Sequence, residues 1–275
     1  MEFVGDIPLD KLSPVKLEEF AQDLHDKGFA HQTIFKRVAY LKGMFKHAVN
    51  KGWIPFNPIS DYTLSPKLGK KTAKRIKLEK NEIEDLFGLD MPPHIRVLFS
   101  ILVTTGMRLD EAALLSWEDI KTDETGKLYF DLTGVDTILK NSGSMRMVPV
   151  PIYIEDMFMG ERGAGPLFPQ FKRDKDGKAS TAASKVLMRL VKKAVNGQKG
   201  KVVHSIRGSL KDMLRDAEVS KEVNDFITGH GSGDVAGAYG SGPSLEVRRE
   251  ALNRVKHTYI VPLSLREQNT FQRGI

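Results

Sequence analysis

The run at residues 97–103, "VLFSILV", limits how this chain can fold more than any other stretch. It continues into "TTGMRLDEAALLSW" with helical rather than alternating spacing, so we expect a buried helix and not a strand. Gly106 would end this helix, and another would start within Asp110–Leu115. The buried helix belongs to a large unit that we expect to begin near Leu78.

A smaller helical unit is predicted before it. Residues 13–28, "SPVKLEEFAQDLHDKG", place Ser13 as a cap, Pro14 at the first helical position and Gly28 at the stop. The next helix should bury a stripe made by Ile34, Val38, Leu41, Phe45 and Ala48. Its other flanks are basic, with Lys36, Arg37, Lys42 and Lys46.

The larger unit also contains three strand candidates, at 127–132, 136–140 and 145–150, and helices return from about residue 181 to 257. The predicted fold class is therefore mainly α with a small antiparallel β-sheet (α+β). We expect a small helical domain at 1–62, a basic linker at 63–78 and a larger domain at 79–275.

Charge and composition narrow the possible functions. The chain has 42 Lys and Arg against 35 Asp and Glu, a net charge of +7, which fits a polyanionic partner without proving one. It has no cysteine, which excludes disulfides, thiolate catalysis and zinc sites built on Cys. No apolar stretch approaches the ~18 residues of a membrane span, so we expect a soluble, cytoplasmic protein without a membrane partner.

The segment 67–80, "KLGKKTAKRIKLEK", has two interpretations. It contains seven basic residues and one acid, which is typical of a solvated linker. It could equally run along a phosphate backbone between two domains. The candidate phosphate-backbone contacts are the flanking residues of the basic helix and this segment: Lys36, Arg37, Lys42, Lys46, Lys70, Lys71, Lys74 and Arg75.

Six residues could carry chemistry, although each has a simpler explanation when taken alone. Arg108 could be a surface residue paired with Glu111, and Lys140 a solvated hairpin lysine. The remaining candidates could be a polar pair on a helix, a capping histidine and a surface tyrosine: His204, Arg207, His230 and Tyr239.

Together these residue types suit phosphoryl transfer to a tyrosine. Two guanidinium groups, those of Arg108 and Arg207, can neutralise the charge that gathers on a phosphodiester without a metal ion. A tyrosine has a pKa of ~10 and needs a proton acceptor, for which His204 is suitable. The leaving alkoxide needs a proton donor, and Lys140 is the candidate.

The order of these residues resembles the tyrosine recombinases, or phage integrases. The similarity covers residues 10–240. Its motifs are an Arg box in "TTGMRLDEAALLSW", a hairpin Lys in "ILKNSGSMRMVPV", the HxxR pair in "HSIRGSL", the histidine of "TGHG" and the tyrosine of "AYG". Three departures stand out: Gly208 where many members have a second histidine, Thr228 for the common leucine, and a hairpin turn one residue longer after Lys140.

The resemblance implies a C-shaped clamp on duplex DNA, a 3′-phosphotyrosyl intermediate at Tyr239, and no cofactor or metal. It implies a homotetramer on two synapsed sites, with directionality or DNA-bending proteins as possible partners. It also implies that His230 binds phosphate from a helix end while the glycine-rich loop lets Tyr239 move. No arm-binding domain is visible before Ser13. The helix expected at 244–257 could dock on a neighbouring subunit or pack within its own chain.

Two alternatives remain open. A type IB topoisomerase-like enzyme would nick and reseal strands with very similar groups. A non-catalytic DNA-binding protein could keep the same fold. We expect a site-specific recombinase, with phage or mobile-element integration and excision as its purpose.

Overall fold

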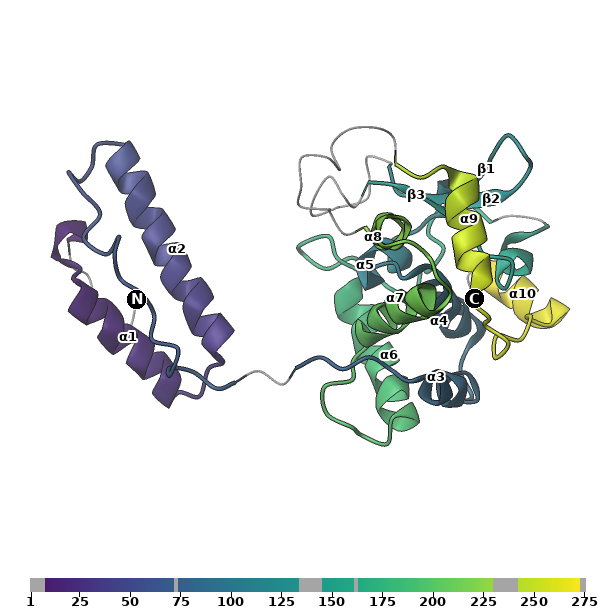
Figure 1. Cartoon of the computed structure of the whole chain (residues 1–275), viewed down its shortest axis with the longest axis horizontal. Helices are drawn as coiled ribbons and strands as arrows, with labels where there is room; N and C mark the ends of the chain where they lie inside the picture. The colour runs from purple at the N-terminus through teal and green to yellow at the C-terminus, as the bar shows by residue number, and fades with distance from the viewer. Residues whose placement is uncertain (1–7, 72–73, 134–144, 161–162, 230–241, 273–275) are drawn as a thin grey trace. The chain divides into compact units, whose positions relative to one another are not determined.

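The computed structural model describes residues 8–71, 74–133, 145–160, 163–229 and 242–272. The chain forms two compact units, 1–74 and 75–275, and Figure 1 shows each of them. The boundary falls inside the predicted linker. Within the described ranges, no helix is long and apolar enough to cross a membrane.

Unit 1 is a pair of helices closed by the segment that follows them. It contains a 3-10 turn at Leu9–Lys11, α1 at Pro14–Asp26 and α2 at His31–Asn50. Ser13 caps α1 by accepting a hydrogen bond from the Lys16 amide at 3.3 Å. The predicted stripe of α2 is buried except for Leu41, which is half-buried. Residues from the following segment complete the core: Ile54, Ile59, Leu64 and Leu68.

Both ends of the predicted linker are bonded to a unit. The Lys70 amide donates to the Phe29 carbonyl at 2.9 Å, and the Lys70 carbonyl accepts from the His31 amide at 3.1 Å. At the other end, the Leu78 amide donates to Ser209 Oγ at 2.9 Å, and that hydroxyl donates back to the Leu78 carbonyl at 2.7 Å. The stretch that joins the two units is therefore shorter than the predicted 63–78.

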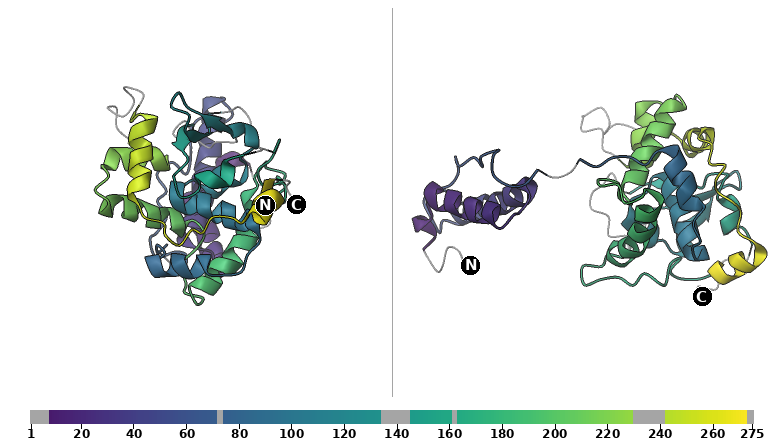
Figure 2. Two further views of the ribbon diagram at one scale, coloured as in Figure 1. Left: turned by 90° about the vertical axis from the view of Figure 1, so that its right-hand side faces the viewer. Right: turned by 90° about the horizontal axis from the view of Figure 1, so that it is seen from below.

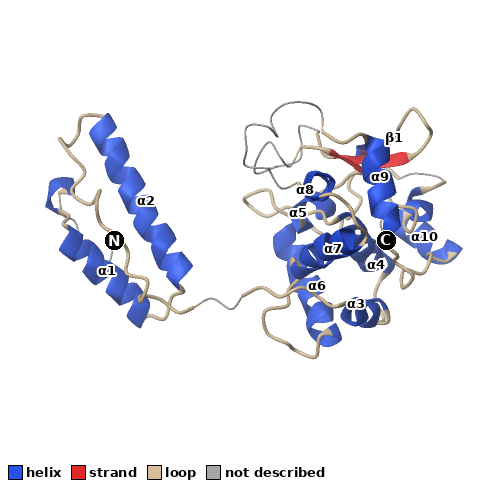
Figure 3. Ribbon diagram, in the orientation of Figure 1, coloured by secondary structure: helices blue, strands red, loops and turns tan. Residues whose placement is uncertain are grey.

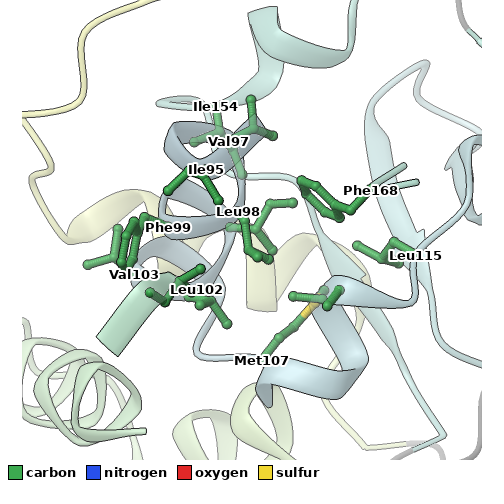
Figure 4. Packing of buried hydrophobic residues seen from close by; sticks show 14 of the residues in the cluster. Ile95, Val97, Leu98, Phe99, Leu102, Val103, Met107, Leu115, Ile154 and Phe168 are labelled. Atoms are coloured by element: carbon green, nitrogen blue, oxygen red, sulfur yellow. The ribbon is translucent and has the colours of Figure 1, made fainter. Parts of the chain in front are cut away.

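Unit 2 is built around α4, Pro93–Thr105, which is the predicted buried helix. Figure 4 shows Leu98 of α4 on the side of the helix toward Phe168, and Phe99 on its other side next to Val103; all of these residues belong to the buried core. Gly106 ends α4 in the left-handed conformation, with φ 64°. The helices around it are α3 Lys80–Phe87, α5 Leu109–Ala113, α6 Ser180–Ala194, α7 Ser205–Asp216 and α8 Lys221–Thr228.

A three-stranded antiparallel sheet is set into this unit, with the order β1-β2-β3. The strands are β1 Ile120–Thr122, β2 Leu128–Asp131 and β3 Met147–Pro149. Phe130 pairs with Ile120 on one side and Val148 on the other. Strand β1 was not predicted, because it has three residues and follows a 3-10 turn at Trp117–Asp119. The candidate strand 136–140 lies outside the described residues. The helix-dominated content in Figure 3 confirms the predicted fold class.

The C-terminal helices lie at the outside of unit 2 in both views of Figure 2. α9, Leu245–Arg254, packs against β3 and α8 of its own chain. The sequence left open whether residues 244–257 dock on a neighbouring subunit or pack within their own chain, and here they pack within their own chain. A further 3-10 turn, Glu155–Phe158, precedes α6, and α10, Leu265–Gln272, buries Phe271 beside Trp117.

Candidate active site

The C-terminus of α8 gathers three arginines from distant parts of the sequence. The last carbonyls of a helix have no partner within it, and the negative end of the helix dipole favours cations there. Three successive carbonyls each accept a hydrogen bond from a different guanidinium: Ile227 from Arg146 Nε at 2.9 Å, Thr228 from Arg207, and Gly229 from Arg108 at 3.0 Å. The end of α8 is therefore the point on which the site is assembled.

Glu111 links two of these arginines. Its Oε1 accepts from Arg108 Nη1 at 2.6 Å and from Arg146 Nη1 at 3.3 Å. Its Oε2 accepts from the Arg108 amide at 2.8 Å and from Arg146 Nη2 at 3.0 Å. Burial alone would raise the pKa of Glu111, but the charge of Arg146 and the hydrogen bonds from both arginines outweigh it, so the pKa is lowered. The carboxylate is therefore ionised although its side chain is only 2% exposed.

Arg207 is buried beside them and is oriented by the backbone. It donates to the Gly106 carbonyl, just after α4, as well as to Thr228. Burial and then the charge of Arg108 lower its pKa to about 9. The guanidinium stays charged at neutral pH and adds to the positive charge at the end of α8.

His204 lies at the N-terminal cap position of α7, one helical turn before Arg207, and is exposed. It lines an open pocket of about 540 Å³ together with Arg207 and Arg75. Partial loss of water lowers the pKa of His204, and the positive charges of Arg207, Arg75 and Arg108 lower it further. At neutral pH the imidazole is therefore neutral and able to accept a proton.

The arrangement is suited to bind an anion and to accept a proton from a group that reacts with it. Three guanidiniums face one carboxylate, which leaves an excess of positive charge at the end of α8. A neutral imidazole and a further arginine, Arg75, line the pocket beside it. Such groups can hold a phosphate and stabilise the charge that develops when it reacts.

Known proteins resemble this chain in sequence. The family described as Phage integrase SAM-like domain matches residues 1–64. The tyrosine recombinase XerC of Xylella fastidiosa (strain M23) is 21% identical over 224 residues, which cover 80% of this chain and 73% of that protein.

Solved structures share the fold along most of the chain. The Tn1549 transposon integrase, in complex with circular intermediate DNA, matches with a TM-score of 0.64 and 20% identity, over 97% of this chain and 87% of that one. A lambda integrase tetramer bound to a Holliday junction matches with a TM-score of 0.62 and 19% identity, over 85% of this chain and 68% of that one. At these identities the likeness establishes the fold.

Residues 1–64 thus match a phage integrase domain, and most of the chain is similar to a tyrosine recombinase. The structure brings four of the predicted residues together, namely Arg108, Glu111, His204 and Arg207. The other three, Lys140, His230 and Tyr239, lie outside the described residues. His230 directly follows Gly229, whose carbonyl accepts from Arg108.

Arg146 is the residue of this site that the sequence did not single out. It directly precedes β3 in "MRMVPV" and is 4% exposed. A signal was present, because arginine is almost never fully buried unless it is paired, and here it stands between apolar residues of a strand candidate. Such a position predicts a buried acidic partner, although it does not say which one.

The predicted DNA contacts fall into two groups. Those with exposed side chains are Lys36, Arg37, Lys46, Lys70, Lys71, Lys74 and Arg75. Arg37 lies over the Phe29 ring at 4.4 Å. Lys42 differs, because it is half-buried and its Nζ donates to the Tyr62 carbonyl at 3.0 Å. It is therefore less available to DNA than the sequence suggested.

Proposed function

We propose that this protein is a tyrosine recombinase, which cleaves and rejoins duplex DNA at specific sites through a covalent bond between Tyr239 and a 3′-phosphate. The observation that carries the proposal is the gathering of Arg108 and Arg207 at the end of α8, directly before His230 and beside the neutral His204. The motif that ends in Tyr239 supplies the nucleophile.

The proposed cleavage step is an in-line displacement at phosphorus. The Tyr239 oxygen bonds to the phosphorus and its proton passes to His204, while the bond from phosphorus to the 5′-oxygen breaks. Lys140 donates a proton to that oxygen, which leaves as a 5′-hydroxyl. Arg108, Arg207 and His230 balance the charge on the nonbridging oxygens. A 5′-hydroxyl of a partner strand then attacks the phosphotyrosine and restores the phosphodiester and the tyrosine.

The assembly and the biological setting are part of the proposal. Recombination between two sites requires protomers on both, and the lambda integrase crystallised as a tetramer on a Holliday junction supports a homotetramer. The matches to a phage integrase domain and to a transposon integrase support integration or excision of a mobile element. Unit 1 would bind DNA as the core-type domain, and the reaction would take place in the cytoplasm.

Covalent trapping tests the proposal. The probes are nicked duplexes with sequences taken from the DNA next to the gene. The nick is positioned so that cleavage releases a short fragment with a 5′-hydroxyl, and the loss of this fragment makes cleavage irreversible. We expect the wild-type protein to form a protein–DNA adduct that survives denaturation, and Tyr239→Phe to form none while it binds the same DNA.

Two results would count against this function. An adduct that persists in Tyr239→Phe would assign the nucleophile to another residue. Relaxation of supercoiled plasmid without any specific site, and without recombinant products, would favour a type IB topoisomerase-like activity.

A further inference from the structure

Arg146 connects three elements with one side chain. It lies directly before β3, its Nη groups donate to both oxygens of Glu111 at the start of α5, and its Nε donates to Ile227 at the end of α8. Its side chain is 2% exposed. A planar guanidinium has fixed donor directions, so these bonds set the position of α5 relative to α8.

We propose that Arg146 is a positioning residue for the cleavage step, acting on DNA only through Arg108 and Glu111. The inference rests on the proposed function. Arg146 is too deeply buried to touch a phosphate, whereas Arg108 has a side chain that is 32% exposed. Arg146 therefore holds the carboxylate that holds Arg108, and it fixes both to the helix end that precedes His230.

The effect of Arg146 follows from the hydrogen bonds of Glu111. Each carboxylate oxygen accepts from one donor of Arg108 and one of Arg146. Without Arg146, each oxygen would lose a donor inside the protein, where an unpaired charge is expensive. The carboxylate would then draw the Arg108 guanidinium toward itself and away from the Gly229 carbonyl and the bound phosphate.

The test compares Arg146→Met with a matched change at Arg249. Arg249 is also a buried arginine of unit 2, with a side chain that is 5% exposed, but it pairs with Asp123 at 2.6 Å and donates to the Leu128 carbonyl at 2.9 Å. Both variants lose a buried ion pair of similar kind. Three quantities are measured for each: the thermal unfolding midpoint, the Kd for the nicked duplex, and the single-turnover rate of adduct formation at saturating protein.

We expect Arg146→Met to form the adduct about 100-fold more slowly than wild type, because a small misplacement of a group that binds the reacting phosphate has that effect. Its Kd should change little, since Arg146 does not face DNA. Arg249→Met should react at close to the wild-type rate. Arg146→Lys retains the charge but cannot bond to all three partners, so its rate should lie between those of wild type and Arg146→Met. If Arg146→Met does not fold, Arg146→Lys takes its place in the comparison.

The double variant isolates the route through Glu111. In a Glu111→Gln background, Arg146→Met should slow the reaction much less than it does in the wild-type background.

Equal slowing of Arg146→Met and Arg249→Met at matched stability would overturn the inference, as would full additivity with Glu111→Gln. A wild-type protein that forms no adduct would overturn the proposed function itself, and the inference with it. Fast adduct formation by both wild type and Arg146→Met would overturn the inference alone.

Discussion

Two buried ionisable side chains, Glu111 and His257, are held in opposite charge states. Glu111 is charged, because two arginines supply donors to both of its oxygens. His257 is fully buried and has one polar contact among the described residues, Nδ1 to the Tyr259 hydroxyl at 2.6 Å. Its Nε2 has no hydrogen-bond partner there. Burial lowers the pKa of His257 to about 4, so the ring is neutral.

Acid should therefore destabilise unit 2 through His257. Its pKa is about 4 in the folded protein and ~6.5 when unfolded, so the unfolded chain takes up the proton first as pH falls. The free energy of unfolding should decrease between those two values by up to ~1.4 kcal/mol per pH unit from this group. Urea unfolding followed by Trp117 fluorescence, in a Trp53→Phe background, measures it in unit 2.

The His257→Gln variant should show a weaker decrease over the same pH range, and His47→Gln, which changes an exposed histidine of unit 1, should match the parent protein. An unchanged pH dependence in His257→Gln would show that His257 is protonated equally in both states.

At the scale of elements, two glycines end the helices that deliver the site. Gly106 ends α4 with φ 64° and Gly229 ends α8 with φ 62°, both in the left-handed region. Gly106 turns the chain toward Arg108, and its carbonyl accepts from Arg207. The left-handed conformation costs free energy for any residue that has a Cβ. Close packing around Gly106 adds to the cost of replacing it.

Gly106→Ala should destabilise unit 2 by ~2–5 kcal/mol, the sum of left-handed strain and overpacking. A Cβ there would lie 3.0 Å from Leu210 Cδ2 and 3.2 Å from Thr228 Cγ2. Gly197→Ala is the matched control, since it has φ 74° but no atom within 4 Å of the added Cβ. It should show the strain alone, ~1–2 kcal/mol. Equal destabilisation in urea unfolding would mean that Leu210 and Thr228 move aside freely.

At the scale of the whole molecule, the chain consists of two units with separate hydrophobic cores and a short basic stretch between them. The main chain on both sides of this stretch is hydrogen-bonded to a unit. Lys71, Lys74 and Arg75 nevertheless keep exposed side chains, and Arg75 also lines the pocket of His204. These features favour a role on phosphates over that of a plain linker.

Replacing Lys70, Lys71 and Lys74 with Gln should therefore weaken DNA binding and flatten its salt dependence. The slope of log K against log salt should decrease in magnitude by ~0.9 for each phosphate that a lysine no longer neutralises. Titrations of a labelled duplex at several salt concentrations measure it. Lys16→Gln with Lys27→Gln is the control, because these exposed lysines are paired with Glu19 and Asp23. A slope unchanged by the triple replacement would return the segment to a linker role.

The sequence by itself determined the local features. The Ser13 cap, the stripe of α2, the buried helix α4 and the stop at Gly106 depend on residues within a few positions of each other. The motif residues could be found in the sequence for the same reason. Arg108 comes just after a helix stop, and the pair of His204 and Arg207 opens a helix. Strand β1 was not predicted, because three residues are too few to show the alternation of apolar and polar side chains that indicates a strand.

Only the tertiary structure decided how these parts meet. Arg108, Arg146 and Arg207 reach the end of α8 from positions 121, 81 and 21 residues away along the chain. Helix α9 packs on its own chain, and Lys42 turns to the Tyr62 carbonyl rather than to solvent. In each case, polar groups inside the protein pair with whichever partner lies nearest in the folded structure. The positions of residues along the chain do not show which partner that is.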